Sequence, residues 1–410
     1  MRLRTVFLIY ILSTSAAIAA PYVMTARVTA ARKLIPTNSE PALEPAPALQ
    51  SRRMWSDTIP ACIAFNALPF NDTIYYQNGM QSDSRDPGNV LRPFVSVASR
   101  GFDSCAVSID GTVYVSETSA NRSSWWLDAY APTGQLRWQV PTEELRGRIA
   151  FGARGMVYLH SSAGTGASVL TAYRADGSKS WETPIGGTRW PPDAPAVAAN
   201  GTIYLVAMSF TAPPQLVAVS SDGKELWRAT LPYSSGEELI LGDDGRIFVR
   251  MYRGAVAFSD RGEKLWEFTS DNQDQDGGIA LAGDGTLYLA SRFLYALDRA
   301  GKPKWIFKSE RTYTDRDYFG YYPLVGKDGT IYANSYYDQL YAITPEGRKK
   351  WVASGDPRNA AQAWGQPTLT KDGTLITRAG WFDVRSGLAV TGWPSENRDN
   401  RNSRHLGENP

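Results

Sequence analysis

Residues 284–305 read DGTLYLASRFLYALDRAGKPKW, and this stretch predicts three short β-strands. The Asp-Gly pair at its start is typical of a turn, and apolar and polar residues then alternate through residues 286–290. Two further strands follow, joined by a turn in which Gly301 suits a positive φ. The apolar run at residues 278–281 adds a strand in front. The whole unit is therefore predicted to be a four-stranded antiparallel sheet.

This unit returns along the chain at a nearly constant interval. The glycines of its first turn are Gly111, Gly155, Gly201, Gly245, Gly285, Gly329 and Gly373. The tryptophans assigned to its last strand are Trp138, Trp181, Trp227, Trp266, Trp305, Trp351 and Trp393. Both series advance by 39 to 46 residues. A period of this size, built from short strands alone, is typical of the blades of a β-propeller.

The number of blades depends on residues 56–103, which resemble a worn copy of the unit. Residues 72–75 and Phe94 keep step with the two markers, although residues 77–90 contain no clear third strand. We therefore expect an all-β chain in which residues 56–393 form a β-propeller of eight four-stranded antiparallel blades. Seven blades is the alternative.

The N-terminus is typical of a secretory signal peptide over residues 1–19. Arg2 and Arg4 precede an apolar run at residues 6–12, and Ala-Ile-Ala at residues 17–19 is a small-residue cleavage site. An uncleaved membrane anchor is the alternative. No later stretch is long enough to cross a bilayer. These features predict an exported protein, periplasmic or extracellular, without a membrane span after removal of the signal.

The segments on either side of the repeats are poor in periodic pattern. Residues 20–55 form a proline-rich linker, and residues 394–410 form a polar tail that we expect to be disordered. The whole chain carries 43 basic and 41 acidic residues. A nucleic-acid or anionic-membrane surface needs an excess of basic residues, so neither partner is expected. We expect a monomer.

Two cysteines, Cys62 and Cys105, fall in or near the innermost strands of the first two predicted blades. In an exported protein they could form a disulfide that fixes the weak first blade. Two buried free thiols are the alternative.

The repeat resembles that of the pyrroloquinoline quinone (PQQ) propellers, the quinoprotein alcohol dehydrogenase-like family. Residues 328–332, DGTIY, with residues 340–343 and 347–351, carry this resemblance, which extends over about residues 56–393. The family includes PQQ-dependent alcohol and sugar dehydrogenases. It also includes cofactor-free members, among them the propeller scaffold of the outer-membrane β-barrel assembly machinery. The resemblance implies the fold and leaves both functions open.

The enzymatic alternative is a PQQ- and calcium-dependent oxidoreductase acting on an alcohol or a sugar. The alcohol dehydrogenases of the family carry a disulfide between adjacent cysteines, whereas Cys62 and Cys105 are 43 residues apart. The chain holds two histidines, His160 and His405, and neither lies in a recognisable catalytic motif. We therefore expect no catalytic residue and no cofactor, with PQQ only under this alternative.

One calcium candidate is residues 271–277, DNQDQDG, where Asp271, Asp274 and Asp276 precede a glycine. Hard oxygen ligands at close spacing are what Ca²⁺ prefers, but the glutamate that ends an EF-hand loop is missing. A solvated acidic loop is the alternative.

The candidate binding surface is the face that gathers the connections between blades and between the two middle strands of each blade. Aromatic and arginine side chains, a composition typical of binding hot spots, are concentrated there: Trp190, Arg311, Tyr313, Arg316, Tyr318, Phe319, Tyr321, Tyr322, Tyr336 and Trp364. Rings that pack on one another over the axial funnel are the alternative. The sequence thus predicts an exported, non-catalytic scaffold for a protein, peptide or glycan of the cell envelope.

Overall fold

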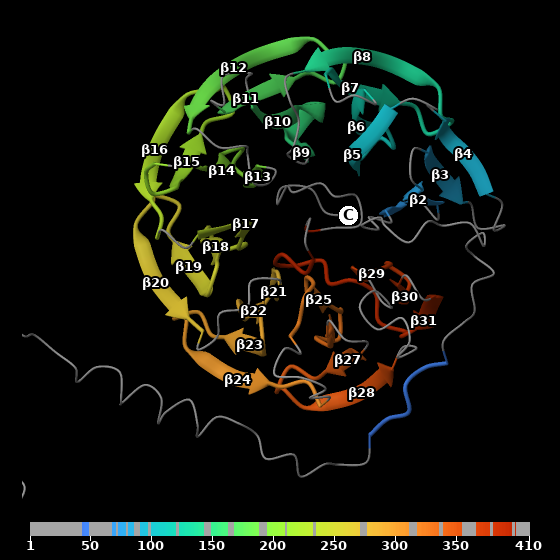
Figure 1. Ribbon diagram of the computed structural model, residues 1–410, viewed down its shortest axis with the longest axis vertical. Helices are drawn as coiled ribbons and strands as arrows, with labels where there is room; N and C mark the ends of the chain where they lie inside the picture. Colours follow the sequence, from blue (N-terminus) through green and yellow to red (C-terminus); the bar gives the residue numbers. More distant parts are fainter. Residues whose placement is uncertain are drawn as a thin grey trace, which may run out of the picture.

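A computed structural model shows a closed ring of small sheets (Figure 1). It describes residues 43–48, 68–70, 73–78, 81–85, 91–96, 100–119, 123–142, 149–162, 168–187, 195–209, 211–232, 235–270, 277–310, 318–335, 339–354, 366–377, 380–395 and 398. These residues form eight antiparallel sheets, seven of four strands and a last one of three. The prediction of an eight-bladed propeller is therefore confirmed, and the sheets are numbered as blades 1 to 8 in chain order.

Within each blade the strands follow one another in sequence order, each paired with its neighbour. Blades 1 to 4 contain β1 (Leu68–Phe70), β2 (Thr73–Asn78), β3 (Gln81–Arg85), β4 (Leu91–Ser96), β5 (Arg100–Val107), β6 (Val113–Ser119), β7 (Trp125–Tyr130), β8 (Leu136–Thr142), β9 (Ile149–Phe151), β10 (Val157–Ser162), β11 (Ser168–Tyr173), β12 (Lys179–Gly186), β13 (Ala196–Val197), β14 (Ile203–Ala207), β15 (Gln215–Val219) and β16 (Glu225–Thr230). A 3-10 turn, Ala153–Gly155, follows β9.

The remaining four blades repeat this plan. They contain β17 (Ser235–Leu241), β18 (Ile247–Met251), β19 (Gly254–Phe258), β20 (Lys264–Thr269), β21 (Ile279–Leu281), β22 (Leu287–Ala290), β23 (Leu294–Leu297), β24 (Pro303–Phe307), β25 (Leu324–Val325), β26 (Ile331–Asn334), β27 (Gln339–Ile343), β28 (Lys349–Ser354), β29 (Thr368–Leu369), β30 (Thr374–Thr377) and β31 (Gly380–Asp383). No helix in the described ranges has the length and apolar character needed to cross a membrane.

The first blade is more complete than its sequence suggests. The stretch 77–90 was expected to lack a third strand, yet β3 lies there and pairs with both β2 and β4. Cys105 lies in β5, the inner strand of blade 2, whereas Cys62 falls outside the described residues. The disulfide between them stays a prediction.

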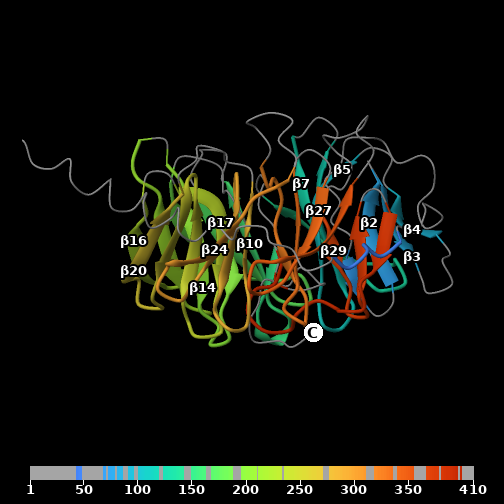
Figure 2. The same cartoon turned by 90° about the horizontal axis from the view of Figure 1, so that it is seen from below.

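Burial follows the distance of each strand from the axis. In blade 6 every residue of β21, β22 and β23 is buried. The outer strands β16 and β20 alternate between exposed and half-buried residues. Strands with one face on the core and one on solvent show this alternation, whereas strands covered on both faces do not. The core is therefore the set of interfaces between blades, and the outer strands form the rim (Figure 2).

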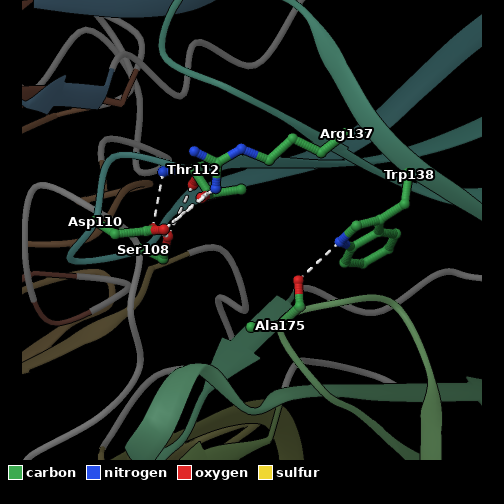
Figure 3. A network of polar contacts seen from close by, with 6 residues as sticks. All are labelled: Ser108, Asp110, Thr112, Arg137, Trp138 and Ala175. Carbon is green, nitrogen blue, oxygen red and sulfur yellow. Dashed lines mark hydrogen bonds and ion pairs between the residues drawn. The ribbon is translucent and has the colours of Figure 1, made fainter.

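The turn between the first two strands of a blade, called the first turn, is built by local hydrogen bonds. In blade 2 the Gly111 N–H donates to the carbonyl of Ser108 at 2.9 Å, and Gly111 has a φ of 80°. Asp110 accepts bonds from the Thr112 backbone N–H at 3.1 Å and from its hydroxyl at 2.9 Å (Figure 3). A type I turn followed by a left-handed glycine gives this hairpin, which explains the recurrent Asp-Gly-Thr.

The repeated tryptophan joins one blade to the next. The Trp138 indole N–H donates to the carbonyl of Ala175 in blade 3 at 2.8 Å (Figure 3). The Trp138 ring also packs edge-on against Tyr114 of its own blade, with ring centroids 5.6 Å apart. The tryptophan therefore covers its own sheet and binds the turn between the third and fourth strands of the next blade, called the outer turn.

The assignment of Trp393 to the last strand of blade 8 is wrong. Trp393 is fully buried, and its backbone exchanges two hydrogen bonds with Leu281 of β21, at 2.8 and 2.9 Å. After β31 the chain turns inward instead of forming a fourth strand. It passes the inner strands of blades 7 and 6, where Ala389 N–H donates to the Val325 carbonyl at 2.9 Å. Gly392 N–H then reaches the Asp243 carboxylate of blade 5 at 2.7 Å.

Candidate functional site

The structure describes part of the predicted binding surface. Of the candidate residues, Tyr318, Phe319, Tyr321 and Tyr322 belong to the described residues. The other candidates lie outside them: Trp190, Arg311, Tyr313, Arg316, Tyr336, Trp364, and the calcium candidates Asp271, Asp274 and Asp276. The binding role of all these residues stays a prediction.

Phe319 is a core residue at the start of blade 7. Its ring has no exposed surface and lies 6.2 Å from the ring of Phe307 and 5.9 Å from that of Tyr341. Its backbone N–H donates to the carbonyl of Ser291 in blade 6 at 2.7 Å, and it forms a β-bridge with Ser335. For Phe319 the structure matches the alternative in which the ring folds inward.

Tyr318, Tyr321 and Tyr322 are half-buried, and the backbone that carries them is fixed. The Tyr322 N–H donates to the Gln366 side-chain oxygen at 3.0 Å, which ties the segment to blade 8. A Cβ atom on Gly278 would lie 2.1 Å from the Tyr322 ring, so this ring occupies space that only glycine leaves open. The backbone that carries the three tyrosines is therefore hydrogen-bonded to blade 6 and to blade 8.

The chain that leads into this segment is fixed as well. Beyond β24, the Glu310 backbone N–H donates to the Tyr341 hydroxyl at 2.9 Å, and the Ser309 hydroxyl lies 3.1 Å from the same atom. The Tyr341 hydroxyl donates to Gln339, and Lys349 forms an ion pair with Glu310. The described backbone on both sides of residues 311–317 is therefore held by hydrogen bonds to blades 6, 7 and 8.

A second group of side chains lies on the same face of the ring, in connections between middle strands and at the end of the outer strand β24. In blade 6 the Lys308 ammonium is 4.8 Å from the centre of the Phe293 ring, and the Arg292 guanidinium carbon is 5.9 Å from it. Phe293 in turn lies 6.2 Å from the buried ring of Tyr295. In blade 5 the corresponding connection carries the exposed Tyr252. We call Tyr252, Arg292, Phe293 and Lys308 the cationic-aromatic patch.

The sequence analysis missed this patch, although a signal was present. Tyr252-Arg253 and Arg292-Phe293 occupy the same position in two successive repeats, immediately before the third strand. Superposing the repeats would have shown that an aromatic residue beside an arginine recurs at a loop position. Each pair alone is too short to stand out from the surrounding apolar strands.

The first turns, on the opposite face, contain carboxylates whose pKa values are lowered. Burial alone would raise the pKa of Asp110, but hydrogen bonds from Ser108, Thr112 and Arg137 outweigh it and lower this pKa to about 2. The pKa values of Asp284 and Asp328 are also lowered, against the effect of burial, by hydrogen bonds from Thr286 in one case and from Ser386 and Thr330 in the other. All three stabilise first turns, so their perturbation is structural.

A buried polar cluster in blade 2 is likewise internal to the fold. The Tyr130 hydroxyl donates to Asp128 at 3.0 Å and to Glu117 at 3.4 Å, and the Gln139 amide donates to both oxygens of Asp128. Burial, followed by the nearby Asp128 and Glu117 carboxylates, raises the pKa of Tyr130. Tyr130, Asp128 and Glu117 each have less than a tenth of their surface exposed, and Gln139 is the exposed member of the cluster.

Metal ligands are not grouped in the described part of the chain, where no three His, Cys, Asp or Glu residues could together hold an ion. The calcium candidate spans residues 271–277, and its proposed ligands Asp271, Asp274 and Asp276 lie outside that part. Calcium at this loop stays a prediction.

Comparison with solved structures supports the fold. BamB from Moraxella catarrhalis aligns with a TM-score of 0.52 at 13% identity, over 77% of this chain and 95% of that one. The C-terminal WD40 domain of Sif2 aligns with a TM-score of 0.58 at 8% identity, over 85% and 99%. A streptogramin B lyase aligns with a TM-score of 0.50 at 11% identity, over 67% and 91%. No curated protein matches the sequence.

The sequence itself matches one family model. The model describes the outer membrane protein assembly factor BamB and matches residues 166–261 and 252–380. The two matches span more than half of the chain and cover the repeats of blades 4 to 7 completely. The chain therefore belongs to the BamB-like family of PQQ-type β-propeller proteins.

Proposed function

We propose that this chain is an exported, non-catalytic scaffold that binds an extended segment of a protein partner in the cell envelope. The binding surface is the loop face over blades 5 to 7. It comprises the cationic-aromatic patch and the aromatic loop of residues 311–322, which we call the anchored loop. The family supports a protein-interaction role, since its model describes an assembly factor.

The observation that carries the proposal is the stacking of two cations on Phe293. Lys308 is exposed while its ammonium lies 4.8 Å from the ring centre, and Arg292 flanks the same ring. Cations held over an aromatic face present their remaining donors to solvent, and arginine donors match carboxylates and peptide carbonyls. A partner segment with acidic side chains fits this chemistry better than a neutral glycan.

The test is affinity capture from an envelope extract with the wild type and with the Arg292→Glu/Lys308→Glu double variant. We expect the double variant to keep the wild-type melting temperature and to lose at least about tenfold in affinity for the captured partner, a change of about 1.4 kcal/mol. The wild-type complex should weaken as salt is raised. The matched control is Lys302→Glu, which alters an exposed lysine in an outer turn on the opposite face.

Equal capture by the double variant and the wild type would show that the patch is not the binding surface. The oxidoreductase alternative is tested separately, by adding PQQ and calcium to the purified protein and following cofactor absorbance and dye-linked alcohol or sugar oxidation. The scaffold proposal expects neither signal to develop. Cys62 and Cys105 cannot supply the adjacent-cysteine element of the alcohol dehydrogenases, which makes the enzymatic reading the weaker one.

A further inference from the structure

The two cations of the cationic-aromatic patch lie over one ring and have no carboxylate partner within the described part of the chain. The Lys308 ammonium is 4.8 Å and the Arg292 guanidinium carbon 5.9 Å from the centre of the Phe293 ring. Carboxylates of blades 5 and 6 and of the chain beyond β24 are engaged by other cations: Glu267 by Lys264, Asp284 by Lys304 and Glu310 by Lys349. Among the described residues the patch is therefore an unmatched positive site.

The connection between blades 5 and 6 is strongly acidic. Residues 271–276, DNQDQD, contain three aspartates and no basic residue. These six residues lie outside the described part of the chain, whereas Ser270 before them and Gly277 after them belong to it. The positions of these two flanking residues show where the acidic segment begins and ends relative to the patch.

The chain enters the acidic segment beside the patch. The Ser270 backbone N–H donates to the Arg253 carbonyl at 2.7 Å, so Ser270 adjoins the tight connection between β18 and β19. Phe268, two residues earlier, packs edge-on against Tyr295 with ring centroids 5.3 Å apart. The other neighbour of the Tyr295 ring is Phe293, at 6.2 Å. A single aromatic ring therefore lies between the end of β20 and the ring that carries the two cations.

The chain leaves the acidic segment beside the patch as well. A Cβ atom on Gly277 would lie 2.3 Å from the Ala290 carbonyl oxygen and 2.5 Å from that of Phe319, so Gly277 is packed directly against the end of β22. The Ala290 N–H donates to the Gly278 carbonyl at 2.9 Å. Arg292 follows Ala290 by two residues. The six acidic-segment residues thus join two points that both adjoin the patch, and a chain of this length reaches at most about 25 Å when extended.

We propose that residues 271–276 are an intramolecular acidic ligand of the cationic-aromatic patch, with their aspartate carboxylates paired to Arg292 and Lys308. Attachment at both ends gives the segment a high effective concentration at the patch, so ion pairs that are weak at a protein surface are sufficient to hold it. The consequence rests on the proposed function: an acidic partner segment has to displace residues 271–276, which makes the contact autoinhibitory. The contact itself requires no partner.

The contact is tested by the rate at which an acetylating reagent modifies the Lys308 amine in the full chain, read by mass spectrometry. The loop variant carries Asp271→Asn, Asp274→Asn and Asp276→Asn, and EDTA keeps metal ions away from the segment in all samples. We expect Lys308 to react at least about threefold faster in the loop variant than in the wild type, because paired carboxylates shield the ammonium and keep it protonated. Added salt should bring the wild type to the rate of the loop variant.

A matched control variant removes three exposed carboxylates from outer turns on the opposite face, through Asp222→Asn, Glu263→Gln and Glu346→Gln. It changes the net charge by the same amount, and its Lys308 should react at the wild-type rate. Lys302, exposed in an outer turn, is the internal control and should react equally in the wild type and the loop variant. Equal Lys308 rates in the wild type and the loop variant, or equal acceleration in both variants, would overturn the contact. Protection that grows with protein concentration would assign it to a second copy and overturn the intramolecular assignment.

A fluorescent synthetic peptide covering residues 269–278 is the second probe. It should bind the loop variant about threefold more tightly than the wild type, the same factor as for the Lys308 rates, because apparent affinity falls with the fraction of chains whose patch is vacant. Adding Arg292→Glu and Lys308→Glu to the loop variant should weaken the peptide at least about tenfold. If these results hold while partner capture ignores the patch, the contact stands and the proposed function fails. If capture depends on the patch while Lys308 reacts equally in the wild type and the loop variant, this inference fails alone.

Discussion

The indole N–H of Trp266 donates a hydrogen bond of 3.1 Å to the backbone carbonyl of Arg299, in the next blade of the ring. The same link, at 2.8 to 3.0 Å, joins four other pairs: Trp138 to Ala175, Trp181 to Ser221, Trp227 to Asp260 and Trp305 to Pro345. In each case the accepting residue stands two positions before the glycine of the outer turn. The tryptophan and the glycine of the repeat are therefore two halves of one contact between blades.

The glycine half of this contact is tested by Gly301→Ala. Gly301 has a φ of 76°, and a Cβ atom there would lie 2.5 Å from the Trp266 ring. The substitution therefore adds a clash to the backbone strain, and we expect the free energy of unfolding to fall by about 2–3 kcal/mol. The control is Gly186→Ala, since Gly186 has a φ of 83° but no atom within 4 Å of the added Cβ. Urea denaturation measures both, and equal losses would show that strain alone is responsible.

The tryptophan half depends on how deeply the ring is buried. Trp305 is 4% exposed, whereas Trp266 is half-buried, although both make the same hydrogen bond. We expect Trp305→Ala to cost about 3–5 kcal/mol, as for other buried large side chains, and Trp266→Ala to cost measurably less. Thermal and urea unfolding of the two variants give the comparison. A larger loss at Trp266 would contradict the assignment of the stabilisation to buried ring area.

The repeat could be predicted from sequence because Gly301 and Trp305 each satisfy a local requirement, a left-handed turn and an interface between blades. Trp393 was misassigned because its spacing fits the period, while its partner Leu281 lies in another blade and leaves no mark on the local pattern. The connection that carries Phe319 was correctly predicted to join two successive blades, here blades 6 and 7. Its composition could not show that Phe319 points inward, since burial is decided by Phe307 and Tyr341 of the neighbouring blades.

Phe319 and Tyr318 are adjacent and are expected to respond differently to substitution. Phe319→Ser removes a fully buried ring and should lower the free energy of unfolding by about 3–5 kcal/mol. Tyr318→Ser changes a half-buried side chain and should cost less than about 1 kcal/mol while weakening partner capture. Melting temperature and affinity capture separate the two effects. If Tyr318→Ser leaves capture unchanged, the anchored loop does not belong to the binding surface.

The C-terminal segment is expected to hold the ring together from the axis. Trp393 is fully buried against blades 5 and 6, so Trp393→Ala should cost about 3–5 kcal/mol although the residue belongs to no blade. Val390, three residues earlier, is 46% exposed and provides the control Val390→Ala, for which we expect a change within about 0.5 kcal/mol. Urea denaturation of both variants checks the prediction. Similar stabilities of the two variants would show that the segment only rests on the ring.

The first turns are expected to make stability depend on pH in the acid range. The pKa of Asp110 is lowered from 3.8 to about 2, so the folded state binds this proton less tightly than the unfolded chain. Its contribution is therefore complete above about pH 4 and is lost as the pH falls toward 2. Because most of the carboxyl is exposed, screening reduces that contribution to about 1 kcal/mol.

The variant Asp110→Asn removes the charge that Arg137 and Thr112 bind, at 3.2 Å and 3.1 Å, and keeps an acceptor oxygen in the turn. We expect the wild type to exceed this variant in free energy of unfolding by about 1 kcal/mol at pH 7, and the difference to disappear between pH 4 and pH 2. Arg137→Gln should show a smaller difference over the same range, because the hydrogen bonds from Ser108 and Thr112 remain. Urea denaturation at pH 7, 4, 3 and 2 measures all three proteins. A difference between wild type and Asp110→Asn that stays constant down to pH 2 would mean that the hydrogen-bond geometry of the turn, and not the charge of Asp110, supplies the stabilisation.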